Sequence, residues 1–125
     1  HGVIDAPIGR DHRDPQRMAV VVDGKPARTR YEVLEEFRTP ADVSSLECRL
    51  ESGRTHQIRV HLSAIGHPVV GDPTYGGVRG GGVESPRPFL HAARLELAHP
   101  VTREPLAFDS PLPDDLAAVL TTLTD

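Results

Sequence analysis

The chain has 125 residues, of which 38% are hydrophobic, and a formal net charge of −4. This length suits one small globular domain, and the acidic net charge excludes a protein that coats nucleic acid through bulk positive charge. The sequence shows no secretory signal and no apolar run long enough to cross a membrane. Because Cys48 is the only cysteine, an internal disulfide is excluded, and a cytoplasmic location is expected.

The first third of the chain combines an abrupt opening with a local excess of positive charge. Residues 1–9 contain no initiator methionine and are expected to be the interior of a longer sequence. Between residues 10 and 30, six basic residues stand against three acidic ones, which leaves a local excess of three; the basic ones are Arg10, Arg13, Arg17, Lys25, Arg28 and Arg30. An RNA contact needs only such a local basic face, although a solvated mixed-charge surface explains any single arginine equally well.

Three strands are predicted in the middle of the chain. An apolar strand is expected at 18–22, and the Asp23-Gly24-Lys25 turn predicts a hairpin to a second strand at 27–37. A third strand at 43–50 is expected to run antiparallel to the second. Cys48 alternates with Leu46 and Leu50 in this strand, which favours a buried strand residue over a nucleophile.

A short amphipathic helix is predicted after the glycine turn at 52–53. The apolar Ile58, Leu62 and Ile65 have the spacing of one helical face. The polar residues Arg54, Gln57 and His61 have nearly the same spacing and are expected on another face. The turn before the helix offers Thr55 or Ser52 as a cap, and Gly66 followed by Pro68 predicts the end.

The last third of the chain predicts a hairpin and a second helix. Strands are expected at 89–98 and 104–108, and a helix at about 116–123 with Asp114 as its cap. The whole reading is an α+β fold, a mostly antiparallel mixed sheet with two short helices. No metal site is expected, because His56 and His61 are five residues apart and no cysteine or acidic partner stands at ligand spacing.

The helix and the loop after it resemble the signature of the RluA/RluD-type pseudouridine synthases, which act on ribosomal and transfer RNA. The similar residues are Gly53-Arg54-Thr55-His56-Gln57-Ile58-Arg59-Val60-His61, followed by Gly66-His67-Pro68-Val69-Val70-Gly71-Asp72. Shorter similar stretches include Ile4-Asp5-x-Pro7-Ile8-Gly9, Gly24-Lys25-Pro26-Ala27 and Leu90-His91-Ala92. The resemblance covers most of the chain and implies that residues 1–125 are the C-terminal part of a pseudouridine synthase catalytic domain.

Enzymes of this family detach the uracil of a target uridine, rotate it and rejoin it to the sugar through carbon, without metal or cofactor. Their catalytic aspartate stands in an Arg-Leu-Asp motif that this sequence lacks, so the catalytic segment is expected upstream and the chain alone is expected to be inactive. The resemblance implies that Arg59 pairs with that aspartate and that Leu90 packs against the target base. It places Arg54, His56 and Gln57 at an RNA-facing rim.

The remaining residues of the signature are given structural roles. His61 is expected to make a helix-end contact, His67 to lie in a turn, and Asp72 to hold a turn or anchor the helix. If half of a sheet lies outside the chain, strands 27–37 or 89–98 have unpaired edges, and self-association of the fragment is expected.

Three functions remain open from the sequence. The first is part of an RNA pseudouridine synthase. The second is an RNA-binding module of the same fold without catalysis. The third is a structural or interaction domain whose polar helix is only solvated.

Overall fold

The computed structural model describes residues 1–76, 83–98 and 100–124. Its centre is a three-stranded antiparallel sheet in the order β1-β4-β5, formed by Gly2–Asp5, Arg28–Phe37 and Val43–Leu50. The long central strand pairs with β1 over Arg28–Tyr31 and with β5 over most of its length. The predicted antiparallel pairing of the second and third strands is therefore confirmed, whereas the expected unpaired edge at 27–37 is wrong for the first part of β4.

The hairpin predicted around Asp23-Gly24-Lys25 is wrong. β3 (Met18–Val20) pairs instead with β2 (Ile8–Arg10) in a separate two-stranded sheet. The backbone of Lys25 exchanges hydrogen bonds of 2.8 and 2.9 Å with Ile8, so the turn folds back onto β2. After β3 the chain continues into β4, which pairs with β1. In this pair the buried Ile4 and Thr29 lie opposite each other and face the core.

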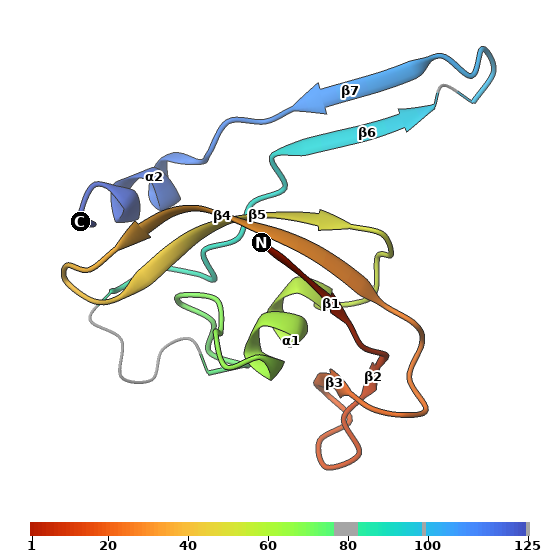
Figure 1. Ribbon diagram of the computed structural model, residues 1–125, viewed down its shortest axis with the longest axis horizontal. Helices are drawn as coiled ribbons and strands as arrows, with labels where there is room; N and C mark the ends of the chain where they lie inside the picture. The colour runs from red at the N-terminus through yellow and green to blue at the C-terminus, as the bar shows by residue number, and fades with distance from the viewer. Residues whose placement is uncertain (77–82, 99, 125) are drawn as a thin grey trace.

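α1 spans Gln57–Ala64 and lies beneath the three-stranded sheet (Figure 1). Neither Thr55 nor Ser52 caps it; the N-cap position is His56, without a side-chain cap hydrogen bond. The predicted end at Gly66 is confirmed. Gly66 has φ +84°, its N–H donates to Ser63, and the next N–H donates to Leu62, which is a Schellman motif.

The burial of α1 differs from the predicted division into an apolar and a polar face. Val60 and Leu62 are buried as core residues, but Ile65 is 42% exposed. Gln57 and His61, expected on the solvent side, are buried at 3% and 0% exposure. The buried residues of α1 are therefore two apolar ones, Val60 and Leu62, and two polar ones, Gln57 and His61.

Two apolar clusters stabilise the body of the molecule. The first contains Ile8, Ala27, Val60 and Tyr75, with Met18 packed against it. The second is built on Ile4, Leu62 and Val69, and partly buried residues from several segments pack on it: Tyr31, Leu46, Ile58, Phe89 and Leu90. α1 contributes to both clusters, so it joins the β2–β3 pair to the three-stranded sheet. Cys48 lies on β5 as predicted and is half-buried; burial, and then the charge of Glu47, raise the pKa of its thiol.

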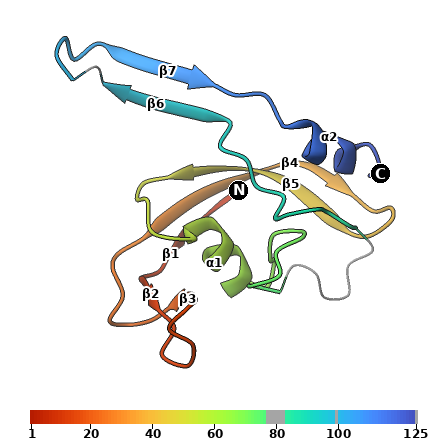
Figure 2. The same ribbon diagram turned by 180° about the vertical axis from the view of Figure 1, so that it is seen from behind.

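The C-terminal hairpin extends away from this body in both views (Figures 1 and 2). β6 (Arg94–Ala98) pairs with β7 (Pro105–Asp109), which confirms the hairpin. Residues 89–93 are irregular and not the start of a strand as predicted. α2 spans Asp114–Leu120, so it begins two residues and ends three residues earlier than expected. The predicted cap at Asp114 is wrong, because Asp114 lies in the first turn and Pro113 occupies the N-cap. In the described parts of the chain, no helix has the length and apolar character that a membrane span requires.

Candidate functional site around Arg59

The centre of the candidate site is a two-pronged ion pair between α1 and the loop that follows it. Arg59 donates from Nε to Asp72 Oδ2 at 2.8 Å and from Nη2 to Asp72 Oδ1 at 2.9 Å. The Asp72 side chain is fully buried and that of Arg59 is 17% exposed. This geometry fixes the plane of the guanidinium and leaves Nη1 without a partner among the described residues.

The ion pair keeps both groups charged. Burial by itself raises the pKa of Asp72. Hydrogen bonds from Arg59 and from the backbone N–H groups of Tyr75 and Thr74 lower this pKa by more than burial raises it, so the net shift is downward. The hydrogen bond to Asp72 raises the pKa of Arg59, against a smaller opposing effect of burial. The pair therefore stays ionised over the physiological pH range.

The backbone around Asp72 explains why this carboxylate reaches Arg59. Its Oδ1 also accepts the N–H groups of Thr74 at 3.0 Å and Tyr75 at 3.2 Å, which closes a tight turn. Gly71 enters that turn at φ +80°, and a Cβ there would lie 2.6 Å from the carbonyl oxygen of Arg87. Only glycine fits such a position without strain. The two roles predicted for Asp72, turn formation and helix anchoring, are both confirmed.

Tyr75 joins the Arg59 pair to two other segments. Its ring, 5% exposed, has the guanidinium carbon of Arg59 at 5.1 Å and that of Arg17 at 5.0 Å from its centroid, within the range of cation–π attraction. Its hydroxyl accepts the N–H of Met18 at 3.0 Å. The same hydroxyl lies 2.9 Å from Nδ1 of His56. Tyr75 thus connects β3 and the residue before it with His56 and Arg59 at the start of α1.

His56 stands at the start of α1 in an unusual backbone conformation. Its φ of 55° lies in the left-handed region, where histidine is among the few side chains found more often than average. The residue is exposed, and its ring meets the Tyr75 ring edge-on with centroids 5.7 Å apart. Burial, and then the charge of Arg59, lower the pKa of His56 against a smaller upward effect of Asp72.

Arg54 and Gln57 occupy different environments although both were expected at the RNA-facing rim. Arg54 is half-buried and donates from Nε to the carbonyl of Pro26 at 2.9 Å, which leaves its terminal nitrogens without a partner among the described residues. Gln57 does not lie at a rim, because its side chain is buried and its amide is fully used inside the protein. Its Oε1 accepts from Ser52 Oγ and the Arg54 N–H.

The amide of Gln57 begins a buried polar chain that joins α1, β4 and the end of β1. Gln57 Nε2 donates to the carbonyl of Arg28 and, at 3.0 Å, to Oγ1 of Thr29. Thr29 Oγ1 lies 2.8 Å from His61 Nδ1, and His61 Nε2 lies 2.9 Å from the carbonyl of Ala6. A carbonyl only accepts, so Nε2 carries the proton of the neutral ring and Thr29 donates to Nδ1. His61 is thus structural, as predicted, but it contacts β4 and β1 and not the helix end.

The contacts of Leu90 are with the second apolar cluster and not with the Arg59–Asp72 ion pair. Leu90 is half-buried, and the cluster on which it packs contains Ile4, Leu62 and Val69. The N–H of the preceding Phe89 donates to the carbonyl of Val70 at 2.8 Å. This hydrogen bond holds the irregular segment 89–93 beside the loop that carries Asp72.

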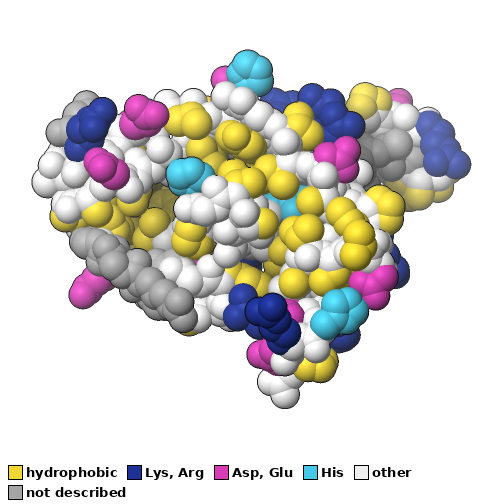
Figure 3. All heavy atoms as spheres, turned by 60° about the horizontal axis from the view of Figure 1, so that its bottom comes forward, with side chains coloured by type: hydrophobic (Ala, Val, Ile, Leu, Met, Phe, Trp, Pro, Cys, Tyr) yellow, Lys and Arg dark blue, Asp and Glu magenta, His cyan; other side chains and the backbone are white. Residues whose placement is uncertain are grey.

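Much of the expected positive charge of residues 10–30 is neutralised locally. Arg28 and Arg30 both pair with Glu51, at 2.7 and 3.4 Å, and Arg17 lies 3.7 Å from Asp11. On the face that carries α1, Lys and Arg side chains form separate groups with acidic neighbours and apolar atoms between them (Figure 3). In this stretch, and counting partners only within the described ranges, three basic residues have no carboxylate at ion-pair distance: Arg10, Arg13 and Lys25.

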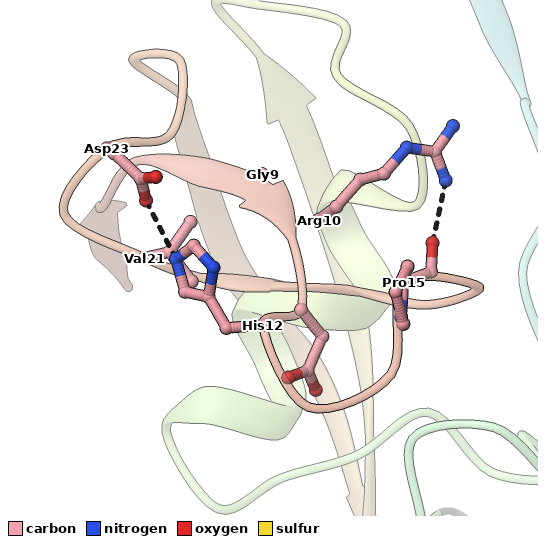
Figure 4. Close-up of a pocket in the computed structure, with 7 residues that line it drawn as sticks. Gly9, Arg10, His12, Pro15, Val21 and Asp23 are labelled. Carbon is pink, nitrogen blue, oxygen red and sulfur yellow. Dashed lines mark hydrogen bonds and ion pairs between the residues drawn. The ribbon is translucent and has the colours of Figure 1, made fainter.

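A shallow hollow of about 340 Å³ opens beside the β2–β3 loop (Figure 4). It is lined by Gly9, Arg10, Asp11, His12, Pro15, Val21 and Asp23 and shares no residue with the Arg59 pair. His12 and Asp23 approach to 3.1 Å, but both side chains are 68% exposed, so water screens their interaction. The hollow therefore offers no enclosed site. Within residues 1–76, 83–98 and 100–124, no group of three or more His, Cys, Asp or Glu side chains is placed to hold a metal ion.

Sequence reasoning did not find the parts that Tyr75 and Arg17 take in the site. Tyr75 was given no contact with other segments, and Arg17 was counted only among the basic residues of the first third. The available signal was Asp72 itself, since an aspartate side chain can close a turn by accepting the backbone N–H two residues further on. Contact between residues 17 and 75 has no signal in a single sequence.

The fold and site define an α+β domain with an arginine-centred polar site beside its helix. The family model of RNA pseudouridylate synthases matches residues 1–64, and the chain belongs to this family. An uncharacterized RNA pseudouridine synthase of Chloroflexus aurantiacus is 56% identical over 99% of this chain and 38% of its own length. The ribosomal large subunit pseudouridine synthase D of Nitrosomonas europaea is 54% identical over 95% of this chain and 36% of its own length.

A solved structure agrees with the sequence relatives. Human RNA pseudouridylate synthase domain containing 1 superposes with a TM-score of 0.80 and 34% identity, covering 98% of this chain and 52% of that one. The chain spans about two fifths of the length of the curated relatives that it matches.

Proposed function

We propose that this chain is the C-terminal part of the catalytic domain of an RNA pseudouridine synthase that converts uridine to pseudouridine in ribosomal RNA in the cytoplasm. The family membership and the relatives named for the large ribosomal subunit support this choice of reaction and substrate. Transfer RNA is the other substrate class that the resemblance allows. The carboxylate nucleophile is assigned to a segment outside the chain, because the sequence has no Arg-Leu-Asp motif.

The observation that carries the proposal is the state of Arg59. A fully buried Asp72 holds two of its nitrogens, yet the side chain keeps 17% of its surface exposed. Nη1 can therefore donate to a second carboxylate without breaking the first pair. An arginine in this position stabilises the ionised form of the incoming aspartate and lowers its pKa, which keeps the nucleophile ready at neutral pH.

The neighbouring residues take supporting roles in this proposal. His56 and Arg54 lie at the start of α1 and contact RNA, Arg54 through the terminal nitrogens that Pro26 does not use. Leu90 packs against the target base after that base is flipped out of its stack. Gln57 supports the site from inside, since its amide orders the turn before α1.

The experiment compares pseudouridine formation in the RNA of the large ribosomal subunit by this chain and by the full-length product of its gene. We expect activity in the longer protein alone. In that protein, Arg59→Gln should reduce kcat by two orders of magnitude or more, as expected when a charged group that stabilises the reacting site is lost (about 10²–10³-fold). The matched control is Arg49→Gln, because Arg49 is 77% exposed on β5 and should leave the rate unchanged.

The outcomes separate the candidate functions. No activity in either protein, with RNA binding retained, favours an RNA-binding module without catalysis. Full activity of the Arg59→Gln variant overturns the role given to Arg59. Activity in the short chain would contradict the placement of the nucleophile outside it.

A further inference from the structure

His56 has a side chain whose polar atoms have no part in holding the helix. The residue occupies the N-cap position of α1 but makes no side-chain cap hydrogen bond. Its backbone has φ 55°, a conformation that is unfavourable for a residue other than glycine. Among the described residues its ring has one hydrogen-bond partner, the hydroxyl of Tyr75. Strain at an exposed position with an unused ring nitrogen is typical of a functional residue.

The donors and acceptors around Tyr75 fix the protonation of that ring. The N–H of Met18 donates to the Tyr75 hydroxyl at 3.0 Å, so the oxygen already serves as an acceptor. The hydroxyl has one proton, and among the described residues the other hydrogen-bonding group within reach is Nδ1 of His56 at 2.9 Å. Every group is satisfied when Tyr75 donates to an unprotonated Nδ1. The neutral imidazole then has its proton on Nε2.

The charges around the ring favour this neutral form. Arg59 lies one helical turn further along α1 and its charge lowers the pKa of His56, as burial does to a larger extent, while Asp72 opposes both. Arg17, from the β2–β3 loop, lies on the Tyr75 ring, as Arg59 does. Arg17 has Asp11 as its own counter-charge at 3.7 Å, so the effects that act on His56 are burial and Arg59 against Asp72, and a positive charge on the ring is disfavoured.

We propose that Tyr75 is a positioning residue that holds His56 in the tautomer protonated at Nε2, and that this N–H is an uncharged hydrogen-bond donor to an oxygen of the RNA substrate. The inference rests on the proposed function for its ligand. It adds a division of labour: Arg54 and Arg59 supply charge, whereas His56 supplies a directional contact that releases no counterion.

The tautomer is tested by nitrogen NMR of the 125-residue chain labelled with 15N. The His56 signals are assigned by their loss in His56→Gln. We expect Nδ1 to have the chemical shift of an unprotonated nitrogen and Nε2 that of a protonated one near neutral pH. In Tyr75→Phe, which keeps the ring between Arg17 and Arg59, the two shifts should move toward each other because both tautomers become populated. A protonated Nδ1 in the wild-type chain overturns the proposal.

The donor role is tested by binding of a fluorescent RNA hairpin with an oligouridine loop. His56→Ala and His56→Asn should each weaken binding about fivefold, the effect of one neutral hydrogen bond. His56→Gln should retain the affinity, because its amide nitrogen can take the place of Nε2 whereas that of asparagine cannot. Tyr75→Phe should weaken binding by about two- to fivefold on the same grounds. Equal affinity of wild type and His56→Ala overturns the donor role.

The salt dependence separates an uncharged contact from a charged one. The plots of log Kd against log salt for wild type and His56→Ala should be parallel, whereas Arg54→Gln should lower the slope by about one. A lower slope for His56→Ala means that the ring binds as a cation and contradicts the inference. If the wild-type chain binds no RNA, the proposed RNA contact fails and the donor role with it, while the NMR shifts still decide the tautomer.

Discussion

Replacing Asp72 by asparagine tests whether the buried ion pair stabilises the loop and helix as the structure indicates. The carboxylate accepts two hydrogen bonds from Arg59 and two from the backbone of its own turn. The amide group of asparagine must turn one N–H group toward these donors and leaves the guanidinium without its counter-charge. Breaking a buried pair on one side costs about 3–5 kcal/mol.

The lower end of that range applies because Arg59 keeps 17% of its surface exposed and water can partly compensate its charge. We expect a loss of about 3 kcal/mol in the free energy of unfolding, which for a chain of this size lowers Tm by roughly 10 °C. The assay is urea unfolding followed by circular dichroism, with Asp115→Asn as the matched control. Asp115 pairs with Arg87 in the same two-pronged geometry, but both side chains are more than 40% exposed, so this control should change the midpoint little.

The pH dependence provides a second criterion. The pKa of Asp72 is lowered in the folded state, so its contribution is present above the unfolded pKa of about 4 and is lost as pH falls through the folded value. The difference between wild type and Asp72→Asn should therefore be largest near neutral pH and narrow in acid. A variant within about 0.5 kcal/mol of wild type at neutral pH, or a difference that does not change with pH, would refute the reasoning.

Two further predictions concern the core and the hairpin. Thr29→Val should lower the free energy of unfolding by about 1–3 kcal/mol, because Gln57 and His61 each lose a buried hydrogen-bond partner. The same urea assay measures this loss, with Thr55→Val at an exposed position as the control. Equal unfolding midpoints for the two variants contradict the prediction. The chain should self-associate through its β6–β7 hairpin, where Leu95 and Phe108 lie opposite each other at 60% and 56% exposure. Light scattering after size exclusion should show a mass that rises with concentration, and replacing both residues by serine should abolish the rise, while a wild-type monomer at every concentration disproves it.

Local patterns were sufficient to predict most of the elements. The alternation in 43–50, the Gly66 stop and the hairpin at the C-terminal end depend on neighbouring residues only, and all are confirmed. The error at β3 has a different origin. A turn signal at 23–25 shows that the chain reverses its direction, but it does not show which strand pairs with the segment before or after the turn. That choice depends on the long-range pairing of β4 with β1.

The contacts of the site were only partly predicted. Arg59 lies on α1 and pairs with Asp72, whereas the resemblance pairs it with an aspartate outside the chain, and that second pairing stays a prediction. Gln57 was expected at an RNA-facing rim and His61 in a helix-end contact, because a periodicity does not reveal buried partners from other elements. Thr29, which satisfies both, is 28 and 32 residues away.

The polar chain through Thr29 also restricts how the strands can align. Thr29 is paired with Ile4 on β1 and with Leu50 on β5, and its neighbours along β4 are the exposed Arg28 and Arg30. A slip of one residue in β4 would place an arginine against the buried imidazole of His61, with no acceptor to receive its charge. A one-residue slip is therefore penalised by an unpaired buried cation, so the Thr29 hydroxyl favours the native alignment of the three strands.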